Sequence, residues 1–142
     1  MDFFIDAVFE EIEKKEKEAH EVYKKLAKML TNPEDKKNIL MLADQELAHD
    51  NFFSGSKKKS VADIPESTLK NLAIFIKDED PSTITSASDL IDFAIREELR
   101  AEESYRVIAE HLPDEEGRQE LLKIAEHEKH HAKVLQRIKS HL

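Results

Sequence analysis

The chain repeats itself without a gap over much of its length. The stretch from Glu16 to Phe53 matches the stretch from Glu98 to Leu135 at an offset of 82 residues, the difference between positions 16 and 98. The matched identities are Glu16/Glu98, Ala19/Ala101, Glu21/Glu103, Tyr23/Tyr105, Ala27/Ala109, Leu30/Leu112, Glu34/Glu116, Leu40/Leu122, Ala43/Ala125, Glu46/Glu128 and His49/His131. Two copies of one unit, each with a half-buried inner face, need each other to complete a core. The repeat therefore predicts two like halves related by an approximate two-fold axis.

Each copy has the pattern of a pair of helices. Apolar residues recur at steps of three and four, which is the spacing of one face of an α-helix. This pattern predicts helices over about 3–30, 33–53, 86–112 and 115–142. Asn32-Pro33 and Pro113-Asp114 separate the helices within each pair, because proline suits a first turn and Asn or Asp suits the cap before it. Connections this short predict two antiparallel hairpins.

The segment between the hairpins is too long for a turn. It covers about residues 55–85 and includes a short helical candidate over 65–77. A segment of this length can cross the full length of a bundle helix. The predicted fold is therefore all-α, a single ferritin-like domain over 1–142. It is a four-helix bundle in which hairpin 1 (about 3–54) and hairpin 2 (about 86–142) are joined by a long crossover (about 55–85).

Composition narrows the class of protein further. Two glycines supply few of the corners that a sheet-rich fold needs, and the absence of cysteine excludes disulfides, thiolate nucleophiles and Cys-ligated metals. A net charge of -9 argues against nucleic acid as a partner. Asp2 and Asp6 interrupt the early apolar run, which argues against a signal peptide or a membrane span and leads us to expect a cytoplasmic protein.

The repeated residues include a set that is typical of metal sites. The second helix of each hairpin carries Glu-x-x-His, and residues at i and i+3 share one helical face, so both side chains can reach one ion. The first helix of each hairpin carries Glu with Tyr seven residues later, nearly two turns away. The candidate metal ligands are Glu16, Glu46, His49, Glu98, Glu128 and His131, and the accompanying tyrosines are Tyr23 and Tyr105.

Charge and ligand type indicate two metal ions. Burying acids without partners is costly, and four converging carboxylates repel one another. Two divalent cations would cancel the four carboxylate charges. A set of carboxylate and imidazole ligands suits iron or manganese. Zinc remains an alternative, because such sites generally bind zinc more tightly than ferrous iron. The alternative is a structural bundle whose acids lie on the surface.

Four stretches of the chain resemble the rubrerythrin branch of the ferritin-like superfamily. They are Glu16–Tyr23, Leu42–His49, Glu98–Tyr105 and Ile124–His131. The resemblance implies that the six candidate ligands bind two iron ions, with Glu46 and Glu128 bridging them. It also implies that Tyr23 and Tyr105 hydrogen-bond to ligand carboxylates.

The resemblance also implies an activity and partners. Proteins of this branch are oxidoreductases that reduce peroxide, so we expect peroxide or dioxygen as the substrate. The family's cysteine-bearing rubredoxin-like domain has no counterpart among these residues, so electrons would come from an external donor such as a rubredoxin-type protein. Ala101 stands where the family has an extra Glu, which keeps open the alternative of a non-enzymatic metal-binding or iron-handling protein. A homodimer is expected by analogy with ferritin-like bundles.

Other histidines are expected to lie outside this set. His127 flanks the second motif but points about 100° away from it, which predicts a surface position. His20 lies one turn beyond Glu16 and its repeat partner is Glu102, so either could approach the site.

Overall fold

The described part of the chain is mostly helical. A computed structural model describes residues 2–53, 65–75 and 79–142. Its elements are α1 (Asp2–Met29), α2 (Pro33–Phe53), α3 (Glu66–Phe75), the 3-10 turn η2 (Pro81–Thr83), α4 (Ala87–Glu110) and α5 (Glu115–Lys139). These described residues contain no strand, so the prediction of an all-α fold is confirmed at that level.

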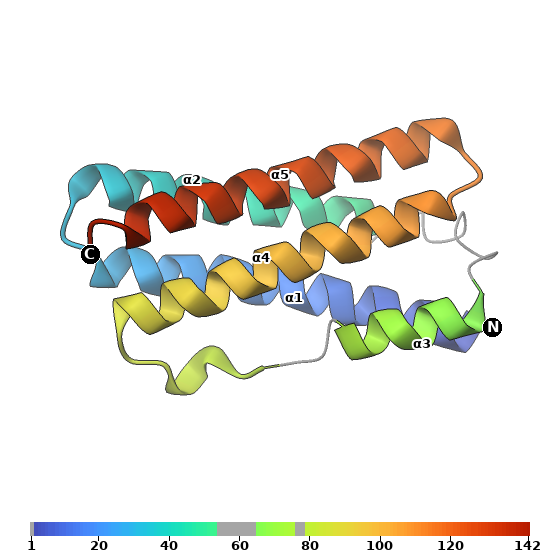
Figure 1. The fold of residues 1–142 in the computed structure, drawn as a ribbon, viewed down its shortest axis with the longest axis horizontal. Coiled ribbons are helices and arrows are strands. Elements are labelled where there is room, and N and C mark those ends of the chain that lie inside the picture. Colours follow the sequence, from blue (N-terminus) through green and yellow to red (C-terminus); the bar gives the residue numbers. More distant parts are fainter. Residues whose placement is uncertain (1, 54–64, 76–78) are drawn as a thin grey trace.

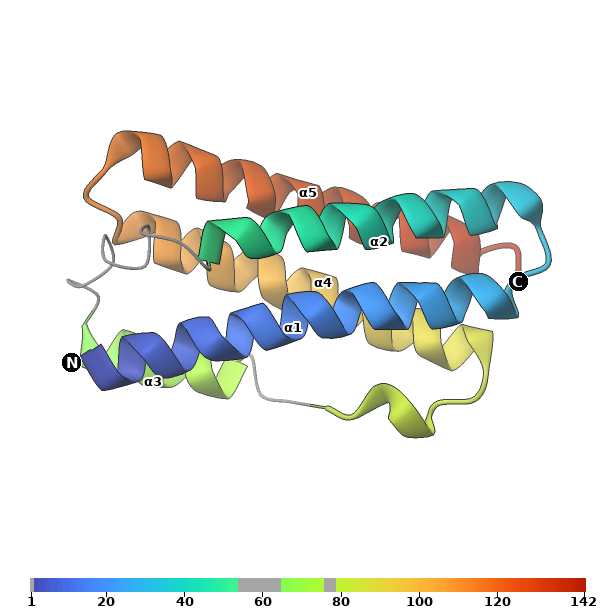
Figure 2. The same cartoon turned by 180° about the vertical axis from the view of Figure 1, so that it is seen from behind.

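The long helices α1, α2, α4 and α5 lie side by side (Figures 1 and 2). The helices α1 and α2 form one antiparallel pair and α4 and α5 form another, while α1 also contacts α4 and α2 contacts α5. Helix α2 ends at the end of the molecule opposite to the one where α4 begins. Between them in the chain, α3 packs against α1 and α4. The predicted crossover falls partly on residues 54–64 and 76–78, which lie outside the described residues.

Local side-chain chemistry explains where the helices begin. The Asn32 side-chain oxygen accepts hydrogen bonds from the backbone N–H groups of Glu34 and Asp35 at 2.9 and 3.2 Å, just ahead of α2. Asp114 caps α5 by accepting from Glu116 and Gly117 at 3.2 Å each. These bonds satisfy N–H groups that the first turn of a helix leaves without partners. The two hairpin connections are therefore short and capped.

The core is divided into two apolar clusters. One includes Ile12 on α1 and Ile108 on α4, and the other includes Leu26 on α1 and Leu135 on α5. On α1, α4 and α5 the charged candidates occupy helix positions between the clusters, as Glu16 does between Ile12 and Leu26, and on α2 they follow its residues of the second cluster. In the described residues, none of the helices combines the length and the apolar character needed to cross a membrane. The helices thus hold a polar layer between two apolar layers.

Candidate metal centre

The structure brings all six predicted ligands into one buried cluster. They come from all four long helices, and each is at most 5% exposed. The cluster consists of Glu16 from α1, Glu46 and His49 from α2, Glu98 from α4, and Glu128 and His131 from α5. The alternative in which these acids lie on the surface is therefore wrong.

The cluster contains two overlapping groups that can each hold a metal ion. Glu46 and Glu128 belong to both groups; Glu16 and His49 complete one, and Glu98 and His131 complete the other. Within each group, one ligand atom from each residue lies within 4.8 Å of all the others. Applying the 82-residue offset converts one group into the other. The sequence repeat is therefore expressed in the geometry of the site.

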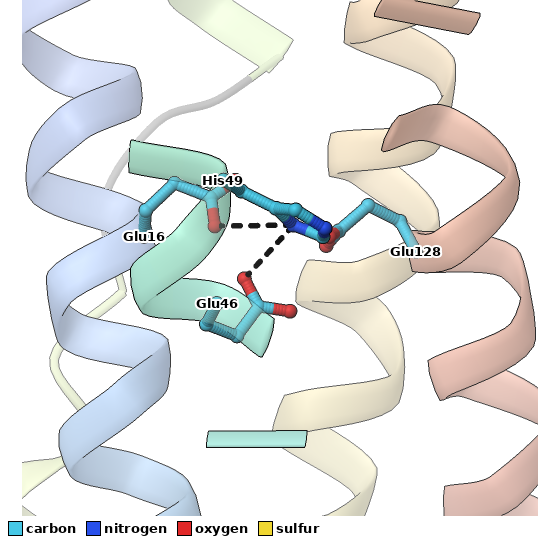
Figure 3. Close-up of side chains that lie close together, drawn as sticks. All are labelled: Glu16, Glu46, His49 and Glu128. Atoms are coloured by element: carbon cyan, nitrogen blue, oxygen red, sulfur yellow. Dashed lines mark ion pairs between the residues drawn. The ribbon is translucent and has the colours of Figure 1, made fainter. Parts of the chain in front are cut away.

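The first group surrounds the Nδ1 atom of His49 (Figure 3). This nitrogen lies 2.7 Å from Oε1 of Glu128, 3.8 Å from Oε2 of Glu16 and 4.0 Å from Oε2 of Glu46. The carboxylates reach it from α1, from its own helix and from α5. Three oxygens and one nitrogen converging from three helices make a donor set of the kind that binds iron, manganese or zinc.

The second group repeats these contacts around His131. Its Nδ1 atom lies 2.8 Å from Oε1 of Glu46, 3.4 Å from Oε2 of Glu98 and 4.0 Å from Oε1 of Glu128. Each distance has its counterpart in the first group, with the two hairpins exchanged. The Nδ1 atom of each histidine makes its shortest contact with the Glu-x-x-His acid of the opposite hairpin. The site therefore exists only when the two hairpins pack together.

The two tyrosines also cross between hairpins. The buried Tyr23 hydroxyl donates a hydrogen bond to Oε1 of Glu98, and the Tyr105 hydroxyl donates to Oε1 of Glu16. Each bond occupies one oxygen of its carboxylate. The other oxygen, Oε2 in both cases, is the one that approaches a histidine. The tyrosines thus orient the two non-shared carboxylates toward the centre of the cluster.

Burial raises the pKa of most of these carboxyl groups. It raises the pKa of Glu16 to about 7, and, with the neighbouring acids, raises the pKa of Glu46 and Glu128 well above the ordinary value. Burial also acts on Glu98, but the proximity of His131 and Glu128 holds the pKa of Glu98 below its usual value. In the metal-free protein the four acids are therefore not all ionised at neutral pH.

Burial also favours the neutral forms of the imidazole and phenol groups, which lowers the pKa of the imidazole and raises that of the phenols. It lowers the pKa of His49 to about 4, helped by the neighbouring His131, and so favours the neutral ring that can bind a metal. Burial and the nearby carboxylates raise the pKa of Tyr23 and Tyr105 well above 10. The two tyrosines therefore stay protonated as hydrogen-bond donors.

Several buried polar atoms of the cluster lack a hydrogen-bond partner. They are Oε2 of Glu16, Nδ1 of His49, Oε2 of Glu98 and Oε1 of Glu128. Buried polar atoms are nearly always paired, so four such atoms facing one another require an explanation. Metal ions would satisfy all four at once, since each atom is a donor of the type that these ions accept. The residues present therefore fit a metal centre.

Two residues outside the predicted set contact the histidines from the outer side. Gln45 places Oε1 2.6 Å from Nε2 of His131, and His127 places Nδ1 3.1 Å from Nε2 of His49. His127 is exposed, as the helical periodicity predicts, yet it still reaches the site. Gln45 and His127 are different residues, but both immediately precede the Glu of a Glu-x-x-His motif and so occupy corresponding positions at the 82-residue offset. This position beside the motif is the feature of the sequence that could have identified them.

The two remaining candidates do not join the cluster. The Nδ1 atom of His20 lies 3.0 Å from the carbonyl oxygen of Ala43. Glu102 accepts a hydrogen bond from Arg106 at 3.1 Å along the same helix. Ala101 is half-buried and lines a small cavity of about 20 Å³ beside Tyr105. Glu102 therefore does not replace the carboxylate that the rubrerythrin resemblance would place at position 101.

The fold and the site together define a helical protein with a buried cluster of Glu and His side chains that can hold metal ions. The chain matches no protein-family model, no curated protein and no solved structure. The resemblance to rubrerythrins thus rests on the four motif stretches alone.

Proposed function

We propose that the buried cluster binds two metal ions and that the chain is a ferritin-like four-helix bundle of the rubrerythrin type, folded as a single domain over 1–142. The observation that carries the proposal is the pair of overlapping ligand groups that share Glu46 and Glu128. Two groups joined by shared carboxylates suit a dinuclear centre with bridging ligands. The matched contacts of His49 and His131 support two positions of similar geometry.

Iron is the metal that we propose, with manganese and zinc as the alternatives. The donors are four carboxylates and two imidazoles, a set that suits iron or manganese. Burial and, after it, repulsion among the acids raise the pKa of Glu46 and Glu128. Two divalent ions would neutralise the four acids and remove that repulsion. The charge of the site therefore supports two ions better than one.

The activity that we propose is reduction of peroxide or dioxygen. Two bound iron ions would supply electrons to the oxidant, and an external donor such as a rubredoxin-type protein would restore them. The protein's own part is to hold the carboxylates through Tyr23 and Tyr105 and to exclude bulk water by burial.

A non-enzymatic metal-binding protein is the alternative that a specific observation favours. Ala101 removes one carboxylate of the rubrerythrin pattern, and Arg106 engages the neighbouring Glu102. A site lacking that ligand would bind the ions without the ligand exchange that the resemblance associates with turnover. Both alternatives share the same metal centre and differ only in reactivity.

Location and assembly are also proposals. We propose a cytoplasmic homodimer. Leu40, Met41 and Leu47 on α2 are each between 44% and 48% exposed, an apolar face that a second copy could cover. Sedimentation analysis at two protein concentrations would test the dimer.

Metal analysis and an oxidation assay test the function. Protein purified without chelator is expected to hold about two ions per chain, one for each ligand group. Protein loaded with iron under anaerobic conditions should change its absorption spectrum when peroxide or dioxygen is added. Addition of an electron donor should then restore the reduced spectrum. Two bound ions without turnover would favour the non-enzymatic alternative. Absence of bound metal would overturn both.

A further inference from the structure

In both histidines, Nδ1 is the inner ring nitrogen, which faces the ligand cluster, and its shortest contacts are nearly equal in length. Nδ1 of His49 lies 2.7 Å from Glu128, and Nδ1 of His131 lies 2.8 Å from Glu46. The two rings lie almost parallel, with an interplanar angle of 12° and centroids 5.9 Å apart. On the side that faces the ligand cluster, the shortest contacts are therefore alike in length, although only that of His131 with Glu46 has hydrogen-bond geometry.

The outer ring nitrogens, Nε2 in both histidines, have different partners. Nε2 of His131 lies 2.6 Å from Oε1 of Gln45, whereas Nε2 of His49 lies 3.1 Å from Nδ1 of His127, and these two rings stack with centroids 5.3 Å apart. Gln45 and His127 occupy the same position in the two copies of the repeat. The two-fold relation therefore breaks at the partner of each outer ring nitrogen.

This difference affects which tautomer of each imidazole is favoured, that is, which ring nitrogen carries the proton. A neutral histidine carries one N–H, so a ring that binds metal through Nδ1 must carry its proton on Nε2. Oε1 of Gln45 can only accept, so it selects that form of His131. Nδ1 of His127 can accept or donate, depending on where His127 carries its own proton. When it donates, the proton of His49 moves to Nδ1, the atom that faces the cluster.

We propose that Gln45 and His127 make the two metal positions unequal, so that the Glu98/His131 position takes the first ion and the Glu16/His49 position takes the second. Gln45 and His127 act here as positioning residues, because each works through the histidine that it contacts. The inference rests on the proposed dinuclear centre and adds an order of filling to it. Partners of this kind typically change metal affinity by about 10- to 100-fold.

Zinc titration followed by nitrogen-15 NMR of the histidine rings tests the order. Zinc is diamagnetic, and the long-range proton–nitrogen spectrum distinguishes a ring with its proton on Nε2, a ring with its proton on Nδ1 and a ring bound to metal. In chelator-treated protein, His131 should carry its proton on Nε2, whereas His49 should show a mixture. At one equivalent of zinc, His131 should be metal-bound in preference to His49 by about tenfold.

Exchanging the two outer partners provides the decisive variants. His127→Gln gives both histidines an amide partner and should reduce the preference to near equality. The double variant Gln45→His with His127→Gln should reverse the preference, so that His49 fills first. Gln45 and His127 are both exposed, so the substitutions leave the core intact. His130→Gln, at another exposed position of α5, is the matched control and should keep the original order.

The outcomes separate this inference from the proposed function. If zinc binds but His49 and His131 fill together in the unmodified protein, or if the double variant still fills His131 first, the order of filling is wrong and the dinuclear centre stands. If no ring shows a bound-metal shift at two equivalents, the dinuclear centre itself is wrong, and the inference falls with it.

Discussion

Glu46 and Glu128 differ from the other ligands because each belongs to both ligand groups. Each lies on the same helix as one histidine of the cluster and makes a short contact with the histidine of the opposite hairpin. Glu16 and Glu98 each belong to one group only and are held by a tyrosine. The shared and the non-shared acids should therefore respond differently to substitution.

Replacing a shared acid should affect both ions, whereas replacing a non-shared acid should affect one. An amide keeps the size of the side chain but cannot supply a charged bridging ligand. Glu46→Gln is expected to leave less than one tightly bound ion per chain, while Glu16→Gln keeps about one, in the group of Glu98 and His131. Elemental analysis after gel filtration measures the stoichiometry. Equal losses in the two variants would contradict the shared role of Glu46.

Removing a tyrosine hydroxyl should destabilise the protein even without metal. Tyr23→Phe leaves Oε1 of Glu98 buried without its donor, which typically costs about 1–3 kcal/mol. Tyr105→Phe acts on Glu16 in the matched half and should have a similar effect. Urea unfolding of chelator-treated protein measures the free-energy change. An unchanged unfolding midpoint in both variants would show that these hydroxyls do not hold the carboxylates.

At the scale of the helices, the predicted boundaries agree with the structure to within a few residues. Helix α2 begins at Pro33 and α5 at Glu115, as the capping residues predict. The short helix predicted over 65–77 is α3, Glu66–Phe75. The ends are less well predicted: α4 stops at Glu110 rather than at 112, and α5 stops at Lys139 rather than at the last residue. Helix starts carry specific caps, whereas helix ends fray.

Removing the cap of α5 should lower stability without affecting the metal site. Asp114→Ala leaves the N–H groups of Glu116 and Gly117 without their acceptor, which typically costs about 1 kcal/mol. For a domain of this size, that corresponds to a fall in melting temperature of about 3 °C. Asp114→Asn retains the acceptor and is the control. Both variants should bind the same amount of metal, because the cap lies at the end of the hairpin and the ligands lie between the apolar clusters.

At the scale of the whole molecule, the helices bury four acids between two apolar clusters. Such a layer is unfavourable unless something balances its charge. Protons supply that balance in the metal-free protein, and metal ions would supply it in the bound protein. Stability should therefore depend on pH and on metal together.

Metal-free protein should become less stable as the pH rises from about 5 to 7. The folded-state pKa of Glu16 is about 7, against 4.5 for the ordinary group, so its favourable contribution is complete below 4.5 and is lost as the pH rises through 7. Glu46 and Glu128 act in the same direction. His49 and His127 act in the opposite direction, because burial lowers the pKa of both, that of His49 to about 4, and this removes stability as the pH falls below 6.5. Three acids outweigh two histidines.

Thermal or urea unfolding in the presence of a chelator measures this pH dependence. Each proton of imbalance between the folded and unfolded states changes stability by about 1.4 kcal/mol per pH unit. Glu46→Gln removes one of the three acids and should flatten the slope. With iron or zinc bound, the slope should reverse, because metal competes with protons for the same atoms. A metal-free protein whose stability rises over this range would contradict the proposed charge balance.

The order of residues along the chain was sufficient to predict the helices, their caps and the six clustered side chains. Helical periodicity, capping and i, i+3 spacing are local properties, and the repeat transferred each conclusion from one copy to the other. Packing between the hairpins decided the remaining contacts. It pairs Tyr23 with Glu98 and Tyr105 with Glu16, and it brings His127 onto His49. These contacts join atoms on different helices, and their distances depend on how the hairpins are rotated and shifted against each other, which no spacing within a single helix specifies.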